Sequence, residues 1–173
     1  MSVKLKFWFF QHYLPVILLL VIILSAILII FWDQINDFEL LLTILGGIVS
    51  FIFIIQKQQL DEIKTFKELF NDFNKRYDRL NSSLNEIAEN GLGENEERKK
   101  NLYKLYDYFN LCGEEYLYYT KGYIFPNVWK AWCNGILYYL EHAPIKEIWD
   151  GENPASYYGL TYQKIRDYSG SKN

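Results

Sequence analysis

The sequence predicts an all-α protein made of a two-helix transmembrane hairpin, a long connecting helix and a small helical cytoplasmic bundle. Two long apolar runs lie in the first third of the 173 residues, and the polar stretch that follows contains no Gly or Pro until Gly91. The remainder shows apolar residues at helical spacing and little alternation. We therefore divide the chain into a hairpin at 1–57, a connecting helix at 58–90, an aromatic helical domain at 91–168 and a flexible tail at 169–173.

The first apolar run extends from Leu14 to Phe31 without a charged residue. At ~1.5 Å per residue it covers about 27 Å, which is enough to cross the hydrocarbon of a bilayer. Pro15 falls in the first turn, where its missing N–H does least harm. The run is too long for a signal peptide, and no A-x-A-like site follows it. We expect a span at about 8–32, with aromatic rings at both headgroup levels (Phe7, Trp8, Phe9, Phe10, Tyr13 and Trp32).

The second apolar run extends from Leu40 to Ile55 and predicts a span at about 38–56. The link between the two runs contains acidic residues but no Lys or Arg, whereas lysines flank the pair at both ends. By the positive-inside rule, we expect a multi-pass protein of a bacterial inner membrane with both termini cytoplasmic. Neither run has an ionisable residue at its centre, which is evidence against a built-in ion pathway.

Four small residues lie on two neighbouring stripes of the second predicted span: Thr43, Gly46, Gly47 and Ser50. Such residues let another helix approach closely, because packing drives helix association in lipid. That helix could be the first span of the same chain or a span of a second copy. We treat these four residues as membrane-helix packing candidates and leave both partners open.

The connecting helix carries a seam of apolar residues whose spacings alternate between three and four, as in a coiled coil. Either two subunits form a coiled coil through this seam, or the helix packs on later helices of the same chain. Large rings at half of the positions favour the second alternative for the distal half, and the proximal half is left open. The Gly91–Gly93 segment then reads as a turn, because no Gly-Lys-Ser/Thr follows it. The seam consists of Ile63, Phe66, Phe70, Phe73, Tyr77, Leu80, Leu84 and Ile87.

The aromatic domain contains most of the tyrosines, since all but one of the 15 in the chain follow Gln56. We expect a helix at 96–120 that ends at Gly122, and a second helix from Pro126 that stops before Pro144. A short helical turn should follow at 145–150. Asn153-Pro154 predicts the start of a last helix that includes Tyr157, Tyr158, Leu160, Tyr162 and Ile165.

Several rings and charges of this domain fall outside its apolar helical faces. Exposed tyrosines supply rigid contact area at a low entropic cost, so they indicate a surface for a protein partner. Alternatively, the rings pack in half-exposed positions and the glutamates are solvated or paired within the domain. The partner-binding candidates are Glu114, Glu115, Tyr118, Lys121, Tyr123, Tyr138 and Tyr139.

The sequence offers little catalytic chemistry. Cys112 and Cys133 fall on apolar helical faces, where we expect buried thiols, and no further ligands accompany them for a metal. The histidines His12 and His142 stand in no catalytic motif. We predict no enzyme activity, no metal and no cofactor. The formal net charge of −3, without a sustained basic run, predicts no direct sequence-specific nucleic-acid binding.

One stretch resembles a known group of proteins. From Tyr106 to Trp132 the chain reads YDYFNLCGEEYLYYTKGYIFPNVWKAW. It resembles a domain of small bacterial two-transmembrane proteins that carry a Tyr/Trp-rich helical cytoplasmic domain. Some proteins of similar layout are associated with antiphage defence, including membrane effectors of retrons. The resemblance implies an effector that disrupts the membrane of its own host when it is released.

These observations lead to two functional hypotheses. The first is a non-enzymatic inner-membrane effector of antiphage defence, whose cytoplasmic domain senses or docks a regulator and whose hairpin oligomerises to disrupt the membrane. The alternative is a constitutive membrane-anchored adaptor that presents a protein-docking surface. The expected partners are the lipid bilayer, further copies of the chain, and a regulatory protein or ribonucleoprotein.

Overall fold

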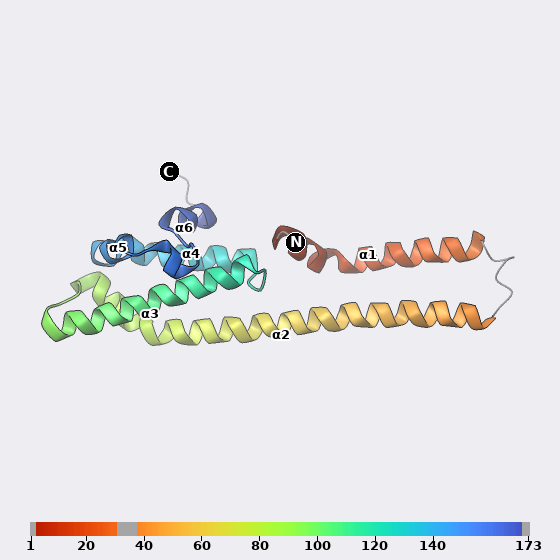
Figure 1. Cartoon of the computed structure of the whole chain (residues 1–173), viewed down its shortest axis with the longest axis horizontal. Coiled ribbons are helices and arrows are strands. Elements are labelled where there is room, and N and C mark those ends of the chain that lie inside the picture. Colours follow the sequence, from red (N-terminus) through yellow and green to blue (C-terminus); the bar gives the residue numbers. More distant parts are fainter. Residues whose placement is uncertain (1–2, 31–37, 171–173) are drawn as a thin grey trace. The chain divides into compact units, whose positions relative to one another are not determined.

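The structure, a computed structural model, describes residues 3–30 and 38–170, and in this part of the chain every regular element is a helix. Figure 1 shows the helices in chain order. The prediction of an all-α fold is confirmed for these residues, which do not show a transmembrane hairpin. Trp32, the acidic link at 33–37 and the end of the predicted tail at 171–173 lie outside the described residues.

The chain divides into two compact units, Met1–Thr65 and Phe66–Asn173. The boundary falls inside one helix, because α2 extends without interruption over Phe38–Asn90. The segment 58–90, which the sequence predicts as a separate connecting helix, is therefore divided between the two units. Its residues 66–90 belong to the same unit as the aromatic helices that follow.

Helix α1 (Val3–Ile30) is interrupted near its start. His12 has φ −116° and ψ 16°, which is not helical, and Pro15 lies within the helix three residues later. A proline inside a helix removes a backbone donor and collides with the carbonyl one turn before it, which breaks or kinks the helix. The interruption falls inside the predicted span at 8–32.

The predicted localisation needs correction. Among the described residues, a single helical stretch is long and apolar enough to cross a bilayer, and it is Leu42–Asn90 of α2. Helix α1 provides no second stretch of this kind among the described residues, and the interruption at His12 divides it. The prediction of a multi-pass protein in a bacterial inner membrane, with both termini cytoplasmic, is therefore wrong. It counted apolar residues and assumed one unbroken helix through the aromatic flank.

The first part of α2 leaves its apolar side chains uncovered. None of the residues in its apolar stretch is buried, and the side chains of Val49 and Phe53 are 66% and 65% exposed. A helix that is apolar around its whole circumference needs an apolar environment, either a protein core or lipid. Within the described residues of Met1–Thr65, no core covers this surface.

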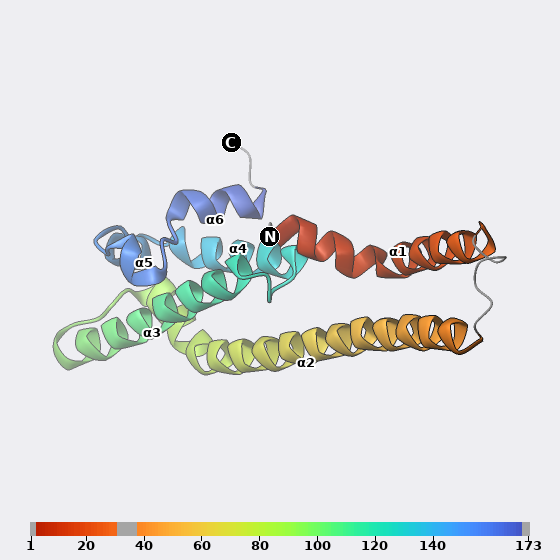
Figure 2. The ribbon, with the colours of Figure 1, turned by 45° about the vertical axis from the view of Figure 1, so that its right-hand side comes forward.

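The second unit is a helical bundle around a continuous core. Besides the end of α2, it contains α3 (Asn95–Thr120), α4 (Pro126–Leu140), α5 (Ala143–Asp150), the 3₁₀ helix η2 (Pro154–Tyr157) and α6 (Tyr162–Ser169). Helix α4 packs against α3, α5 and α6, and α3 runs below α4 and α6 in both views (Figures 1 and 2). The largest fully buried side chains are Trp129, Phe73, Phe109, Leu84, Ile87, Leu105, Leu111, Ile124, Leu140, Ile145, Leu160 and Ile165.

Two local features depend on glycine. Gly122 ends α3 with φ +77°, as the sequence predicts. Gly113, in the middle of α3, lies against η2, and a Cβ there would come within 3.1 Å of the Tyr157 backbone. The 3₁₀ helix can therefore approach α3 only because position 113 has no side chain.

The prediction of one last helix from Asn153-Pro154 is wrong. The chain forms only the short η2 there, with the Asn153 side chain accepting the Ala155 N–H. It then takes positive φ at Tyr158 and Gly159, which ends any helix. Helix α6 begins afresh at Tyr162, where the Thr161 hydroxyl accepts the Lys164 N–H at 3.2 Å. The signal that sequence reasoning missed is Gly159 followed two residues later by a threonine cap.

Candidate functional site

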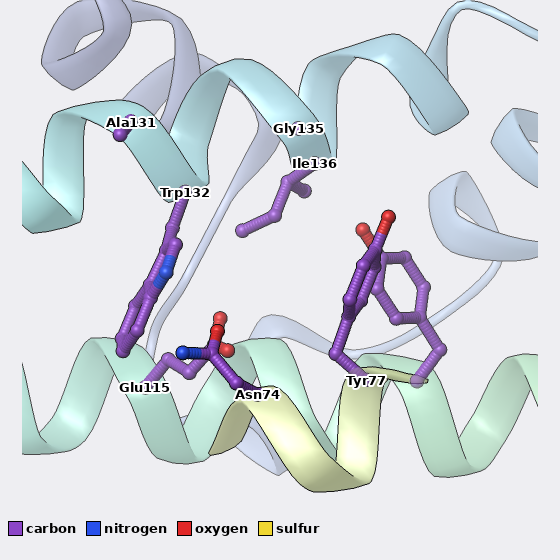
Figure 3. A pocket seen from close by; sticks show the side chains of 8 residues that line it. Asn74, Tyr77, Glu115, Ala131, Trp132, Gly135 and Ile136 are labelled. Atoms are coloured by element: carbon purple, nitrogen blue, oxygen red, sulfur yellow. The ribbon is translucent and has the colours of Figure 1, made fainter. Parts of the chain in front are cut away.

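A pocket of about 190 Å³ lies between α2, α3 and α4 of the second unit. Figure 3 shows Trp132 at one end and Tyr77 at the other, with Glu115 and Asn74 between them and their polar ends directed towards α4. Tyr108 adds a third ring to the lining. The pocket therefore combines aromatic walls with a polar floor.

Small residues on α4 keep this pocket open. Ala131 and Gly135 line it from positions one helical turn apart, and both are exposed. A Cβ added at Gly135 would meet no atom within 4 Å. Glycine within a helix costs roughly 0.5–1 kcal/mol relative to alanine. No close packing compensates for that cost here, so Gly135 widens the pocket at the expense of helix stability.

The polar floor contains a buried carboxyl group. Glu115 is 7% exposed, and within the described part of the chain no hydrogen bond or ion pair joins it to another side chain. Burial raises the pKa of Glu115 to about 8; the charge of Arg76 opposes this shift and that of Glu114 adds to it. Glu115 is therefore mostly protonated at neutral pH, and an ionised form would need a partner.

The tyrosine and cysteine groups near Glu115 on α3 and α4 are neutral. Burial raises the pKa of Tyr108 and of Cys112 well above their usual ranges, and it raises the pKa of the Cys133 thiol to about 12. Both cysteines are buried as free thiols, so the expectation of buried thiols is confirmed. None of the residues that line the pocket is Lys, Arg or His.

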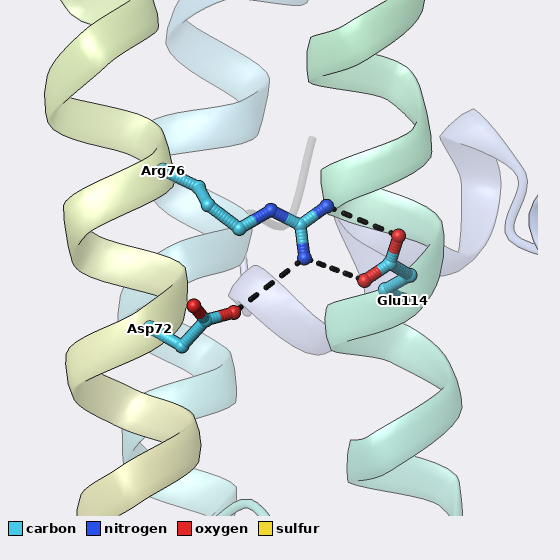
Figure 4. Close-up of polar contacts among 3 residues, drawn as sticks. All are labelled: Asp72, Arg76 and Glu114. Carbon is cyan, nitrogen blue, oxygen red and sulfur yellow. Dashed lines mark hydrogen bonds and ion pairs between the residues drawn. The ribbon is translucent and has the colours of Figure 1, made fainter.

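Glu114, the neighbour of Glu115, lies in a different environment. Its two carboxylate oxygens accept hydrogen bonds from the Arg76 guanidinium at 2.6 Å and 3.0 Å (Figure 4). Asp72 approaches the same guanidinium at 3.7 Å. The Glu114 hydrogen bond raises the pKa of Arg76, which keeps its charge. This ion pair connects α2 to α3. Arg76, Glu114 and Asp72 together have a net charge of −1.

The remaining partner-binding candidates divide between two regions. Tyr139 is buried beside the pocket, where its hydroxyl donates to Asn81 Oδ1 at 2.7 Å and lies 3.2 Å from the Tyr77 hydroxyl. Tyr138 on the same helix is 54% exposed. Tyr118, Lys121 and Tyr123 lie near the end of α3, where Tyr118 packs against Phe73 and Tyr123. The structure thus brings Glu115 and Tyr139 to one region but does not join all seven residues.

Sequence reasoning missed most of the pocket. Tyr77 is predicted only as part of the apolar seam, and the predicted site residues do not include Asn74, Tyr108, Trp132 or Gly135. The available signal was the pair Ala131 and Gly135, because two small residues one turn apart leave a gap in a helix face.

The seam of α2 shows two kinds of environment. Phe73, Leu80, Leu84 and Ile87 lie in the core of the second unit, which is the packing that the intrachain alternative describes. Ile63, at the proximal end, is exposed. Between them, half-buried rings contact later elements: Phe66 and Phe125 have centroids 4.6 Å apart, and Phe70 stacks on Trp132 at 5.9 Å.

The membrane-helix packing candidates are all exposed. Thr43 donates its hydroxyl to the Glu39 carbonyl at 2.9 Å, within its own helix. A Cβ at Gly46 or Gly47 would meet no described atom within 4 Å. No described helix thus packs closely at Gly46 or Gly47, and the two packing partners that the sequence leaves open remain predictions.

The described residues contain no group of three or more His, Cys, Asp and Glu side chains that could hold a metal ion. Comparisons of this chain with protein-family models, with curated proteins and with solved structures each found no match. The resemblance of residues 106–132 to small bacterial membrane proteins therefore stays a prediction.

Proposed function

We propose that this chain is a docking protein tethered to a lipid bilayer, and that it has no catalytic role of its own. The apolar first part of α2 serves as a single anchor. The helical bundle at 66–170 receives one side chain of a partner protein in the pocket between α2, α3 and α4.

The pocket is the observation on which this proposal rests. Its volume of about 190 Å³ is below the roughly 300–1,000 Å³ of sites that bury drug-sized ligands. Protein interfaces, in contrast, concentrate their binding energy in a few anchor side chains that fill small pockets. Aromatic walls with one buried polar group suit such an anchor.

The state of the thiols supports a role without catalysis. A nucleophilic cysteine needs a lowered pKa, because the thiolate is the reactive form. Here the pKa of Cys112 and the pKa of Cys133 are both raised by burial. His142, the one histidine of this unit, has Nδ1 2.8 Å from the Tyr138 carbonyl, one turn back along the chain. Neither thiol is thus prepared for attack on a substrate.

The exposure of α2 supports the tether. The apolar side chains near Val49 are uncovered on all sides, and the helix has the length and composition for one crossing. Large uncovered apolar surfaces are rare on soluble monomers and mark contacts with a membrane or a protein. The antiphage effector hypothesis required two spans, and no described contact favours it, so its defence role stays a prediction.

Site-specific photocrosslinking tests the docking role in the full chain. A benzophenone amino acid at Tyr138, which is exposed on α4 three residues after the pocket residue Gly135, should form a discrete adduct with one protein in the host cell. The same probe at Tyr103, 60% exposed on α3, provides the matched control and should form no such adduct. Absence of an adduct from Tyr138, or an equal yield from both positions, would contradict the proposal.

A further inference from the structure

We propose that the pocket binds an alkylammonium group, the end of a lysine side chain of the docked partner, with the Glu115 carboxylate as its counter-ion. This inference rests on the proposed docking function and names the chemistry of the anchor. Glu115 is buried, projects into the pocket and has no polar partner among the described side chains, so a ligand in the pocket can supply one (Figure 3).

The charges around the pocket favour a cation. No basic residue lines it, and the nearest cation that acts on Glu115 is Arg76. Arg76 is held by two hydrogen bonds to Glu114 and by Asp72, and this group of three has a net negative charge. An incoming anion would meet a negative field, whereas an ammonium ion would meet a carboxylate without competition from a neighbouring lysine.

The remaining lining suits the rest of a lysine side chain. Trp132, Tyr77 and Tyr108 offer ring surfaces for the methylene groups and ring faces that attract a cation. The ammonium group has three donors, and the pocket offers the two oxygens of Glu115 and the amide oxygen of Asn74. The gap at Gly135 is a route of entry, since no atom stands within 4 Å of a Cβ there.

Binding of an ammonium ion should depend on pH. Glu115 holds a proton below pH about 8, and an ammonium ion needs the ionised carboxylate. The affinity should therefore rise by up to about tenfold per pH unit towards that pKa, while the ligand amine keeps its charge until about pH 10. Arg76 and Tyr77 on α2, Glu114, Tyr108 and Cys112 on α3, and Cys133 on α4 are the titratable groups that act on or face Glu115.

Calorimetric titration of the full chain in a non-ionic detergent, with n-butylammonium as the probe, tests this assignment. We expect binding at pH 8 that weakens at pH 6, and no binding of butan-1-ol, which has the same carbon chain and no charge. Glu115→Gln should lower the affinity roughly tenfold or more and remove the pH dependence. Gly135→Leu should lower it by filling the pocket. Glu147→Gln, at an exposed site on α5, should stay within about twofold of wild type.

Circular dichroism on each variant separates loss of binding from loss of folding. An unchanged affinity in folded Glu115→Gln, or equal binding of butan-1-ol, would overturn the assignment. Nα-acetyl-lysine methylamide, whose side-chain ammonium is free, should bind at least as well as n-butylammonium. If n-butylammonium binds and the lysine derivative does not, the occupant is a small amine and the lysine assignment is wrong. If the Tyr138 crosslink forms equally in wild type and in Glu115→Gln, docking stands and the lysine anchor fails.

Discussion

The two ends of α2 both carry large apolar side chains, but in opposite environments. Around Val49 these side chains occur on every side of the helix and none is buried. From Phe73 to Ile87 they occupy one stripe, and that stripe is the core of the helical bundle. The number of apolar residues and their arrangement around a helix thus decide together whether the helix needs an apolar solvent or a folded partner.

The difference extends to polar groups. In the bundle, tyrosines form a connected network: Tyr77, Tyr139 and Asn81 are joined through hydrogen bonds between their side chains. In the first part of α2, the Thr43 hydroxyl bonds back to its own helix. A helix that faces lipid must satisfy polar groups internally, whereas a bundle can satisfy them between helices.

The largest predicted effect concerns the core of the bundle. Trp129 is 0% exposed and packs against Tyr116, Tyr119 and Tyr168 at centroid distances of 5.7, 5.3 and 6.1 Å. Trp129→Ala should cost about 3–5 kcal/mol, because it removes a large ring and leaves a cavity. Urea unfolding followed by circular dichroism measures this loss.

Tyr103→Ala, at an exposed position on α3, is the control and should change stability by no more than about 0.5 kcal/mol. Membrane association should persist in Trp129→Ala, because the anchor does not depend on the bundle core. Release of Trp129→Ala from membranes would contradict the independence of the apolar anchor from the bundle core.

The second prediction concerns the anchor. Val49→Arg places a charge near the middle of the apolar run, where it should cost about 2.5–3.5 kcal/mol in a bilayer. We expect the variant to shift from the membrane pellet to the supernatant in fractionation, with an unchanged unfolding curve for the bundle. Ser82→Arg, at an exposed position on the distal part of the same helix, should remain in the membrane pellet as wild type does. An equal distribution of Val49→Arg and wild type between pellet and supernatant would contradict the proposed anchor.

The sequence was sufficient for the features that rest on strong local signals. The helical class, the left-handed Gly122 and the end of the long helix before Gly91 all follow from periodicity and glycine position. The last helix and the first span were less accurate. A short break at Tyr158-Gly159 decided the outcome for the last helix, and α1 is likewise interrupted at His12; apolar counting does not detect such breaks.

The pocket illustrates a different difficulty. Glu114 and Glu115 are both partner-binding candidates from the sequence, which does not distinguish the environment of one glutamate from that of the other. The structure separates them: one carboxylate is paired with Arg76 across two helices, and the other is buried without a partner. Successive residues of a helix point about 100° apart, so the separation depends on which neighbours pack on each side.

The third prediction uses this separation. The folded state holds the Glu115 proton up to pH about 8, whereas the unfolded chain releases it near pH 4.5. Glu115 therefore stabilises the fold below pH 4.5, and this contribution is lost as the pH rises through the folded pKa, at about 1.4 kcal/mol per unit. Between pH 5 and pH 7, the free energy of unfolding of wild type should fall by roughly 2–3 kcal/mol relative to that of Glu115→Gln. Urea unfolding at both pH values measures it, and parallel pH profiles would contradict the buried, unpaired state of Glu115.

The smallest effect belongs to the paired neighbour. Arg76 and Glu114 side chains are 32% and 34% exposed, so solvent screens their attraction, although the two hydrogen bonds favour the bidentate geometry. Glu114→Gln should cost at most about 1 kcal/mol, and the cost should shrink in high salt. A double-mutant cycle with Arg76→Gln isolates the coupling, and a coupling of several kcal/mol would mean that this pair behaves as a buried one. Because Glu114→Gln removes one partner of Arg76, a guanidinium that turns towards Glu115 would lower the Glu115 pKa and so narrow the pH range over which wild-type stability is lost. That result would show that the ion pair is what keeps the nearest cation away from the pocket.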